Sequence, residues 1–65
     1  MTRRWTVLVD WVDGPVEDTD EVVVMAATPS AAVAAAKRMW RLTIGAEWPA
    51  CRLTKASIVT KEKNF

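Results

Sequence analysis

An alanine-rich stretch between strand-like segments constrains the fold of this chain more than any other feature. Residues 31–43 are dominated by good helix formers, and Gly45 follows them as a natural stop. Thr28 and Pro29 favour a helix start, because threonine caps the first turn and proline needs no amide donor there. We therefore expect one helix over about Pro29–Ile44.

Small side chains on one side of this helix predict close packing against a sheet. The residues expected to face the sheet are Ala32, Ala36, Met39 and Thr43, flanked by Ala35 and Trp40. Basic residues gather on the opposite side and near the helix end, where they complement the helix dipole.

Alternating apolar residues predict three strands. The first covers Trp5–Val12, the second Glu21–Ala27 and the third Cys51–Thr60. Asp13-Gly14-Pro15 has strong turn chemistry, and we expect Val16–Asp20 to form a loose acidic connection after it.

The third strand has an irregular pattern. Leu53 and Ile58 fall on opposite faces unless a bulge near Lys55 brings them back into phase.

The order of elements predicts a single α+β domain over residues 1–65. We expect a β-β-α-β chain, with a three-stranded sheet and one helix packed on one face. The third strand either pairs parallel with the second through a right-handed crossover, or lies beside the first. The second arrangement puts the first strand in the centre, and we expect the third strand then to run antiparallel to the second. Lys61–Phe65 is expected to be a flexible tail.

This pattern resembles a known class of small modules. The segments EVVVMAATPSAAVAAAKRMW and RLTKASIV are similar to the β-β-α-β accessory proteins of bacteriophages, actinobacteriophages among them, and of mobile elements. In outline they also resemble the ribosomal LX-type domain. The resemblance implies a fold and an accessory role, and it carries no functional residue.

Charge is segregated along the chain. Six acids and no base lie within residues 10–21, and residues 1–36 sum to −4, from two bases and six acids. Residues 37–65 sum to +5, from seven bases and two acids. Such fields steer association with charged partners. The acidic segment is expected to be either a solvated loop or a surface that attracts a basic partner.

Catalysis and metal binding are not expected. The chain has no histidine, so the commonest general base is missing, and Cys51 has no imidazole to activate it. Two glycines do not make a phosphate-binding loop, and the acid spacing matches no calcium loop. We therefore expect no catalytic, cofactor-binding or metal-binding residues.

Tryptophans and the basic helix face are the candidate binding features. Four tryptophans in 65 residues exceed what so small a core can hold, and tryptophan and arginine are enriched at interfaces. The candidate partner-binding residues are Trp5, Trp11, Trp48, Lys37, Arg38 and Arg41.

These observations favour a non-enzymatic protein-binding accessory module. Its partner is expected to be another protein or a second copy of itself, because a helix on one sheet face leaves the other face uncovered. The alternative is a small nucleic-acid-binding protein that uses the basic helix face. The sequence has no signal-peptide pattern and no stretch of about 18 apolar residues, so a cytoplasmic location without membrane contact is expected.

Overall fold

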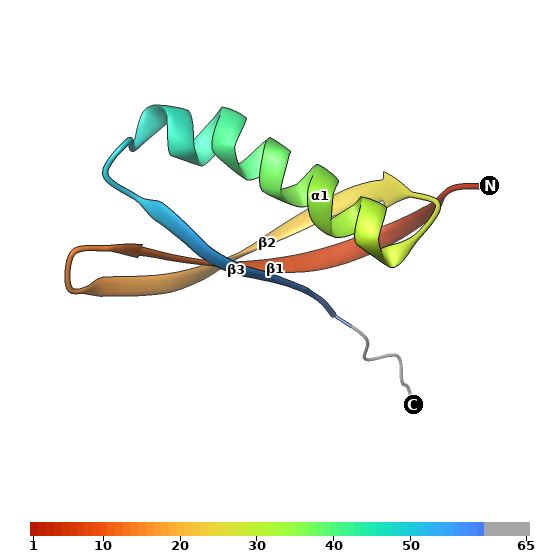
Figure 1. The fold of residues 1–65 in the computed structure, drawn as a ribbon, viewed down its shortest axis with the longest axis horizontal. Helices are drawn as coiled ribbons and strands as arrows, with labels where there is room; N and C mark the ends of the chain where they lie inside the picture. The colour runs from red at the N-terminus through yellow and green to blue at the C-terminus, as the bar shows by residue number, and fades with distance from the viewer. Residues whose placement is uncertain (60–65) are drawn as a thin grey trace.

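The computed structural model describes residues 1–59, and the expected tail lies outside this range. Its elements are strands β1 (Arg3–Asp13) and β2 (Val16–Ala26), helix α1 (Pro29–Trp40), the π-helical segment η1 (Arg41–Gly45) and strand β3 (Arg52–Ile58). The strands form one antiparallel sheet, and α1 with η1 packs on one of its faces (Figure 1). The predicted α+β class and β-β-α-β order are confirmed.

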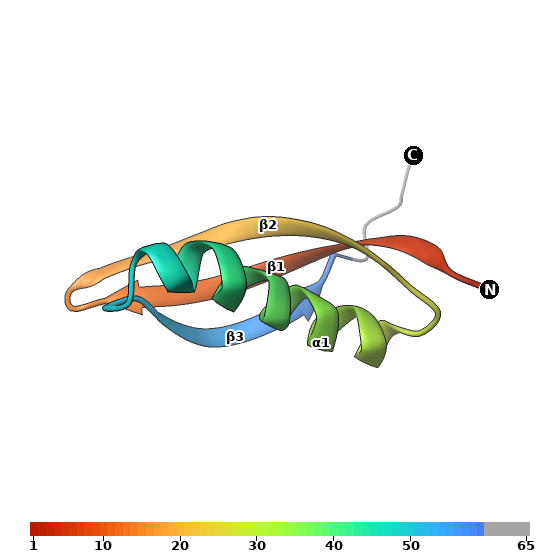
Figure 2. The same cartoon turned by 90° about the horizontal axis from the view of Figure 1, so that it is seen from above.

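The first strand is the centre of the sheet. The strand order is β2-β1-β3, and β1 is antiparallel to both neighbours, as Figure 2 shows from the helix side. Two strands that are both antiparallel to β1 must run in the same direction as each other. The expectation that the third strand runs antiparallel to the second was therefore wrong.

A tight turn replaces the expected loose connection between β1 and β2. Asp13 pairs with Val16, so only Gly14 and Pro15 lie between the strands. Gly14 has φ +63°, which suits the first position of a type II′ hairpin turn. This turn sets the register that pairs Val16–Asp20 with β1. The poor strand propensity of the acids in this segment is outweighed by that pairing.

The predicted bulge in the third strand is confirmed. Asp10 pairs with Lys55, whereas the next residue, Trp11, pairs with Leu53. Thr54 is the additional residue, and its hydroxyl donates to the Asp10 carbonyl oxygen over 3.1 Å. The bulge places Leu53 and Ile58 on the same side of the sheet, against the core.

The helix begins where the sequence predicts and ends differently. The Thr28 hydroxyl accepts from the Ala31 amide over 3.2 Å, with Pro29 as the first helical residue. Gly45 does not stop the helix, and helical backbone continues to Glu47. A Cβ at Gly45 would lie 3.3 Å from Cζ3 of Trp40, so glycine here makes room for the indole.

The buried side of the helix is rotated relative to the expected stripe. Ala32, Ala36 and Trp40 are buried, whereas Met39 and Thr43 are exposed. The bulky indole of Trp40 defines the contact line at an i, i+4, i+8 spacing. The core cluster consists of Val7, Val9, Val24, Ala26, Ala32, Ala36 and Trp40.

Opposite the helix, the sheet has a face that no element of residues 1–59 covers, and we call it the open face. From the strand register its apolar members are Leu8, Val12, Val23 and Met25. Its other members are Arg4, Thr6, Asp10, Glu17, Thr19, Glu21, Arg52, Lys55 and Ser57. Val23 and Met25 are 52% and 61% exposed. Neither helical segment of the described chain is both long and apolar enough to cross a membrane.

Candidate binding surfaces

The four tryptophans occupy different environments. Trp40 is buried and Trp48 is 60% exposed, while Trp5 and Trp11 are partly buried on the helix side of β1. Trp5 lies near the start of β1, where its indole N–H donates to the Ala26 carbonyl oxygen over 2.9 Å. The Arg3 guanidinium lies 5.5 Å from the Trp5 ring centroid. These contacts give Trp5 a packing role, apart from the other candidate residues.

Trp11 and Trp48 meet at the opposite end of the sheet. The β1–β2 turn and the loop from η1 to β3 lie at this end, as Figures 1 and 2 both show. The two indoles line a pocket of about 290 Å³, which we call the hairpin-end pocket. Its full lining is Trp11, Asp13, Asp20, Ile44, Trp48 and Cys51.

Backbone hydrogen bonds hold the loop that carries Trp48. The Trp48 amide donates to the Ile44 carbonyl oxygen over 2.8 Å, and the Cys51 amide donates to the Trp48 carbonyl oxygen over 3.0 Å. Trp48 is thus anchored at both sides of its backbone although its side chain faces solvent. The part of the pocket that Trp48 forms is therefore held in place by backbone hydrogen bonds.

The Trp11 indole N–H lacks a hydrogen-bond partner among the described residues. Its Nε1 atom is buried, whereas the indoles of Trp5 and Trp40 both donate to oxygen acceptors. Buried polar groups are nearly always paired in folded proteins, so an unpaired one invites a functional explanation.

Cys51 is held in its thiol form. Partial desolvation raises the pKa of Cys51, and the nearby carboxylates of Asp13 and Asp20 raise it further. A raised pKa lowers the thiolate fraction at neutral pH, and the thiolate is the nucleophile. Cys51 is therefore a wall of the pocket whose thiolate fraction is smaller than that of a fully exposed cysteine.

A second pocket lies on the open face of the sheet near the hairpin, since Asp10, Val12, Glu17 and Thr19 line it. It has a volume of about 410 Å³. Its lining is Asp10, Trp11, Val12, Glu17, Asp18, Thr19 and Thr54. No base lines either pocket, so carboxylates line both faces of the sheet near the hairpin.

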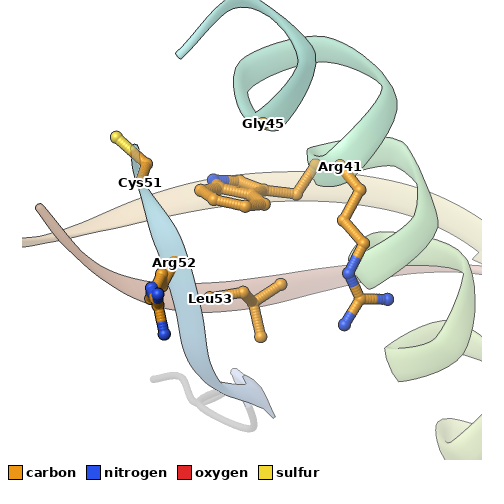
Figure 3. Close-up of a pocket in the computed structure, with 6 residues that line it drawn as sticks. Arg41, Gly45, Cys51, Arg52 and Leu53 are labelled. Carbon is orange, nitrogen blue, oxygen red and sulfur yellow. The ribbon is translucent and has the colours of Figure 1, made fainter. Parts of the chain in front are cut away.

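Basic residues line a different pocket, beside the end of the helix. Arg41 of η1 and Arg52 of β3 project on either side of Leu53 (Figure 3). This pocket has a volume of about 400 Å³. The proximity of Arg41 and Arg52 was not predicted from the sequence, because it depends on where β3 lies relative to the helix.

The remaining basic candidates lie along the helix. Arg38 is exposed and Lys37 is partly exposed. Arg38 lines a pocket of about 330 Å³ with Ala35, Met39, Leu42 and Thr43. The structure thus brings Trp11 and Trp48 together, and it leaves Trp5 and the basic helix residues in separate places.

Within residues 1–59, no group of three or more His, Cys, Asp or Glu side chains is arranged to hold a metal ion. Comparison of the chain with protein-family models, with curated proteins and with solved structures finds no match in any of the three.

Proposed function

We propose that this chain is a non-enzymatic protein-binding module that self-associates through the open face of its sheet. The observation that supports this best is the apolar part of that face, where Leu8 and Val12 of the central strand β1 are partly exposed and Val23 and Met25 of β2 are exposed. The helix covers the other face, and a second copy is an economical cover because most soluble oligomers are symmetric pairs.

The size of the open face sets the expected affinity. Three strands at about 4.8 Å spacing, and roughly 24 Å of shared length, present on the order of 400 Å². Stable complexes usually bury about 800 Å² per partner, so the proposed dimer belongs to the weak, reversible class. We expect dissociation constants of about 10 μM to 1 mM.

Charge placement favours one way of stacking two copies. Glu17, Val12 and Arg52 form one cross-strand row of the open face. In aligned sheet packing with a two-fold axis along β1, β2 of one copy lies over β3 of the other. Glu17 then faces Arg52 of the second copy. Leu8 and Val12 meet their own counterparts, and Lys55 from each copy flanks the paired Asp10 residues.

A second candidate function, nucleic-acid binding, has one observation in its favour. Arg41 and Arg52 flank one pocket, and Lys37 lies one helical turn before Arg41. Bases so placed contact phosphates in many complexes. The acidic residues of the hairpin would repel a nucleic-acid backbone that extended beyond this pocket. We therefore rank nucleic-acid binding second.

The proposal includes an accessory role of the kind found in bacteriophages and mobile elements. Its support is the shared β-β-α-β order alone. It also includes a location in the cytoplasm, where a single cysteine stays reduced.

Concentration-dependent NMR tests the proposed interface. Between about 20 μM and 500 μM protein, we expect shifts at Leu8, Val12 and Val23 and none along α1. Leu8→Asp should abolish the shifts, because it places a charge at the centre of the interface. Leu42→Asp is the matched control, since Leu42 is 71% exposed on the helix side. Shifts confined to the helix, or shifts that persist in Leu8→Asp, would contradict the interface.

Heparin and DNA titrations separate the two candidates. We expect no retention at about 150 mM salt. Steeply salt-dependent DNA binding that is lost in Arg41→Gln and Arg52→Gln would favour the nucleic-acid role.

A further inference from the structure

The two edge strands of the sheet differ in how well their outer backbone groups are protected. β3 is interrupted by the bulge at Thr54 and carries Lys55, and both features discourage the addition of another strand. β2 forms the other edge and pairs with β1 in unbroken register over its whole length (Figure 2). The outer edge of β2 is therefore the place where the sheet is open to extension.

The strand pairing shows which backbone groups of β2 point outward. The Val59 amide donates to the Thr6 carbonyl oxygen over 2.9 Å. The N–H and C=O of Val7 therefore point away from β3 and toward Val22 of β2. Since these groups alternate in direction along a strand, every second residue of β2 directs them away from the sheet. The residues with outward backbone groups are Glu17, Thr19, Glu21, Val23 and Met25.

The outward groups are protected only in the acidic half of β2. The Asp18 carboxylate accepts from the Thr19 amide over 2.8 Å, so this half of the edge is capped by its own side chain. The amides of Glu21, Val23 and Met25 have no hydrogen-bond partner within residues 1–59. The free part of the edge is therefore Glu21–Met25.

The helix flank on this side of the sheet is apolar and exposed. Arg41 projects beside β3, where it lines a pocket with Leu53 (Figure 3). Met39 precedes Arg41 by about 200° around the helix, so its flank faces the β2 side of the sheet. Ala35 and Leu42 line a pocket with Met39, and Leu42 is 71% exposed. A strand added beside β2 would direct every second side chain toward this flank.

We propose that the outer edge of β2 binds an extended segment of a partner protein as a fourth, antiparallel strand beside Glu21–Met25. Backbone hydrogen bonds hold such a strand, and its alternate side chains give specificity. Apolar side chains face the helix flank at Met39, and a basic side chain lies opposite Glu21 on the open face. This inference rests on the proposed function of protein binding and names the form of the partner.

Charge favours a partner segment over a second copy of β2 at this edge. β2 contains no base, so a second copy in antiparallel register has no opposite charge to place beside Glu21. A lysine in a partner strand supplies that charge.

Amide hydrogen exchange by NMR tests the site residue by residue. The full chain at about 20 μM is titrated to about 1 mM with acetyl-Thr-Val-Thr-Val-Lys-Val-Lys-amide, whose first lysine lies opposite Glu21 in the proposed register. The Leu8→Asp variant, which lacks the proposed dimer, is titrated in parallel. In both chains we expect exchange at Glu21, Val23 and Met25 to slow by about threefold or more, and exchange at Thr19 to stay unchanged.

Two N-methylated peptides separate backbone pairing from side-chain contact. N-methylation of the second threonine removes a donor directed at β2, and it should weaken binding by about tenfold or more. N-methylation of the second valine removes a donor directed away from β2. This peptide is the matched control, and its affinity should stay within about twofold of the parent peptide.

Variants of the chain fix the location. Because the Val23 amide points outward, an edge strand can accommodate proline there, and Val23→Pro should fold and lose peptide binding. Val23→Thr keeps the donor and should bind within about twofold of the parent chain. Met39→Gln should weaken binding by about threefold, whereas Ala34→Gln, at an exposed residue on the far side of the helix, should not. If Val23→Pro does not fold, the two N-methylated peptides still decide the outcome.

Two results would overturn the proposal: unchanged exchange at Glu21, Val23 and Met25, or equal binding of the two N-methylated peptides. Slowing of these amides with protein concentration alone would assign the edge to a second copy and overturn the proposal as well. Self-association through the open face is measured separately. A monomer that binds the peptide would refute only the dimer, and a dimer whose edge amides ignore the peptide would refute only the edge site.

Discussion

The indole N–H of Trp40 donates a hydrogen bond to the carboxylate of Asp20, with 3.1 Å between Nε1 and Oδ2. Trp40 is the last residue of α1 and only 2% exposed, so water does not compete for this donor. This hydrogen bond connects the end of α1 to β2 beside the hairpin-end pocket. It gives an acidic residue of the hairpin a defined structural role.

Removal of the acceptor should destabilise the fold. Asp20→Ala leaves a buried N–H unpaired, and we expect a loss of about 1–3 kcal/mol in the free energy of unfolding. Asp20→Asn keeps an oxygen acceptor and should lose less. Urea denaturation of both variants measures the difference, and equal losses would show that the hydrogen bond contributes nothing.

The helix orientation can be tested with two alanines. Ala36 is fully buried against the sheet and Ala34 is exposed. Ala36→Asp buries an unpaired charge at a cost of several kcal/mol, enough to unfold a domain this small. Ala34→Asp should change the melting temperature by only a few degrees. Circular dichroism melts of the two variants provide the comparison, and similar melting temperatures would contradict the orientation.

The elements that follow local chemistry were predictable from the sequence. The Thr28 cap and Pro29 set the helix start whatever surrounds them, and the mismatch between Leu53 and Ile58 required a bulge. Val16–Asp20 was misjudged because its strand character comes from pairing with β1. The buried side of the helix was predicted incorrectly, because it is set by the packing of Trp40 beside Gly45, which is a tertiary effect.

The candidate site was predictable only in part. Trp11 and Trp48 were recognised as unusual, but they are far apart in the chain and meet only when the loop after η1 folds back over the hairpin. Asp13 and Asp20 belong to the acidic segment, yet only the tight turn at Gly14 places them beside the indoles. No local pattern in the sequence encodes that meeting.

Replacing Gly14 with another residue should destabilise the fold. It has φ +63°, and an added Cβ would meet nothing within 4 Å, so the penalty comes from the left-handed conformation alone. Gly14→Ala should lower the free energy of unfolding by about 1–2 kcal/mol, and Gly14→Asn by less, because asparagine tolerates this region better. Urea denaturation checks both. A neutral Gly14→Ala variant would argue against the two-residue turn.

Reactivity of Cys51 should follow its raised pKa. Desolvation and the carboxylates of Asp13 and Asp20 disfavour the thiolate, so iodoacetamide at pH 8.5 should modify the folded chain more slowly than the unfolded chain. Asp13→Asn removes one of the charges and should speed the reaction, whereas Glu21→Gln should not. The unfolded chain loses the thiol proton first, so stability should fall as pH rises above about 8.5. A folded-state rate equal to the unfolded one would refute this account.

Self-association through the open face is the central claim, and sedimentation equilibrium tests it most directly. The parent chain, from about 1 μM to 500 μM, should pass from monomer mass toward dimer mass with a midpoint between about 10 μM and 1 mM. The Leu8→Asp variant should remain at monomer mass over the whole range, while Leu42→Asp should follow the parent. A parent chain that stays strictly monomeric at every concentration would contradict the claim.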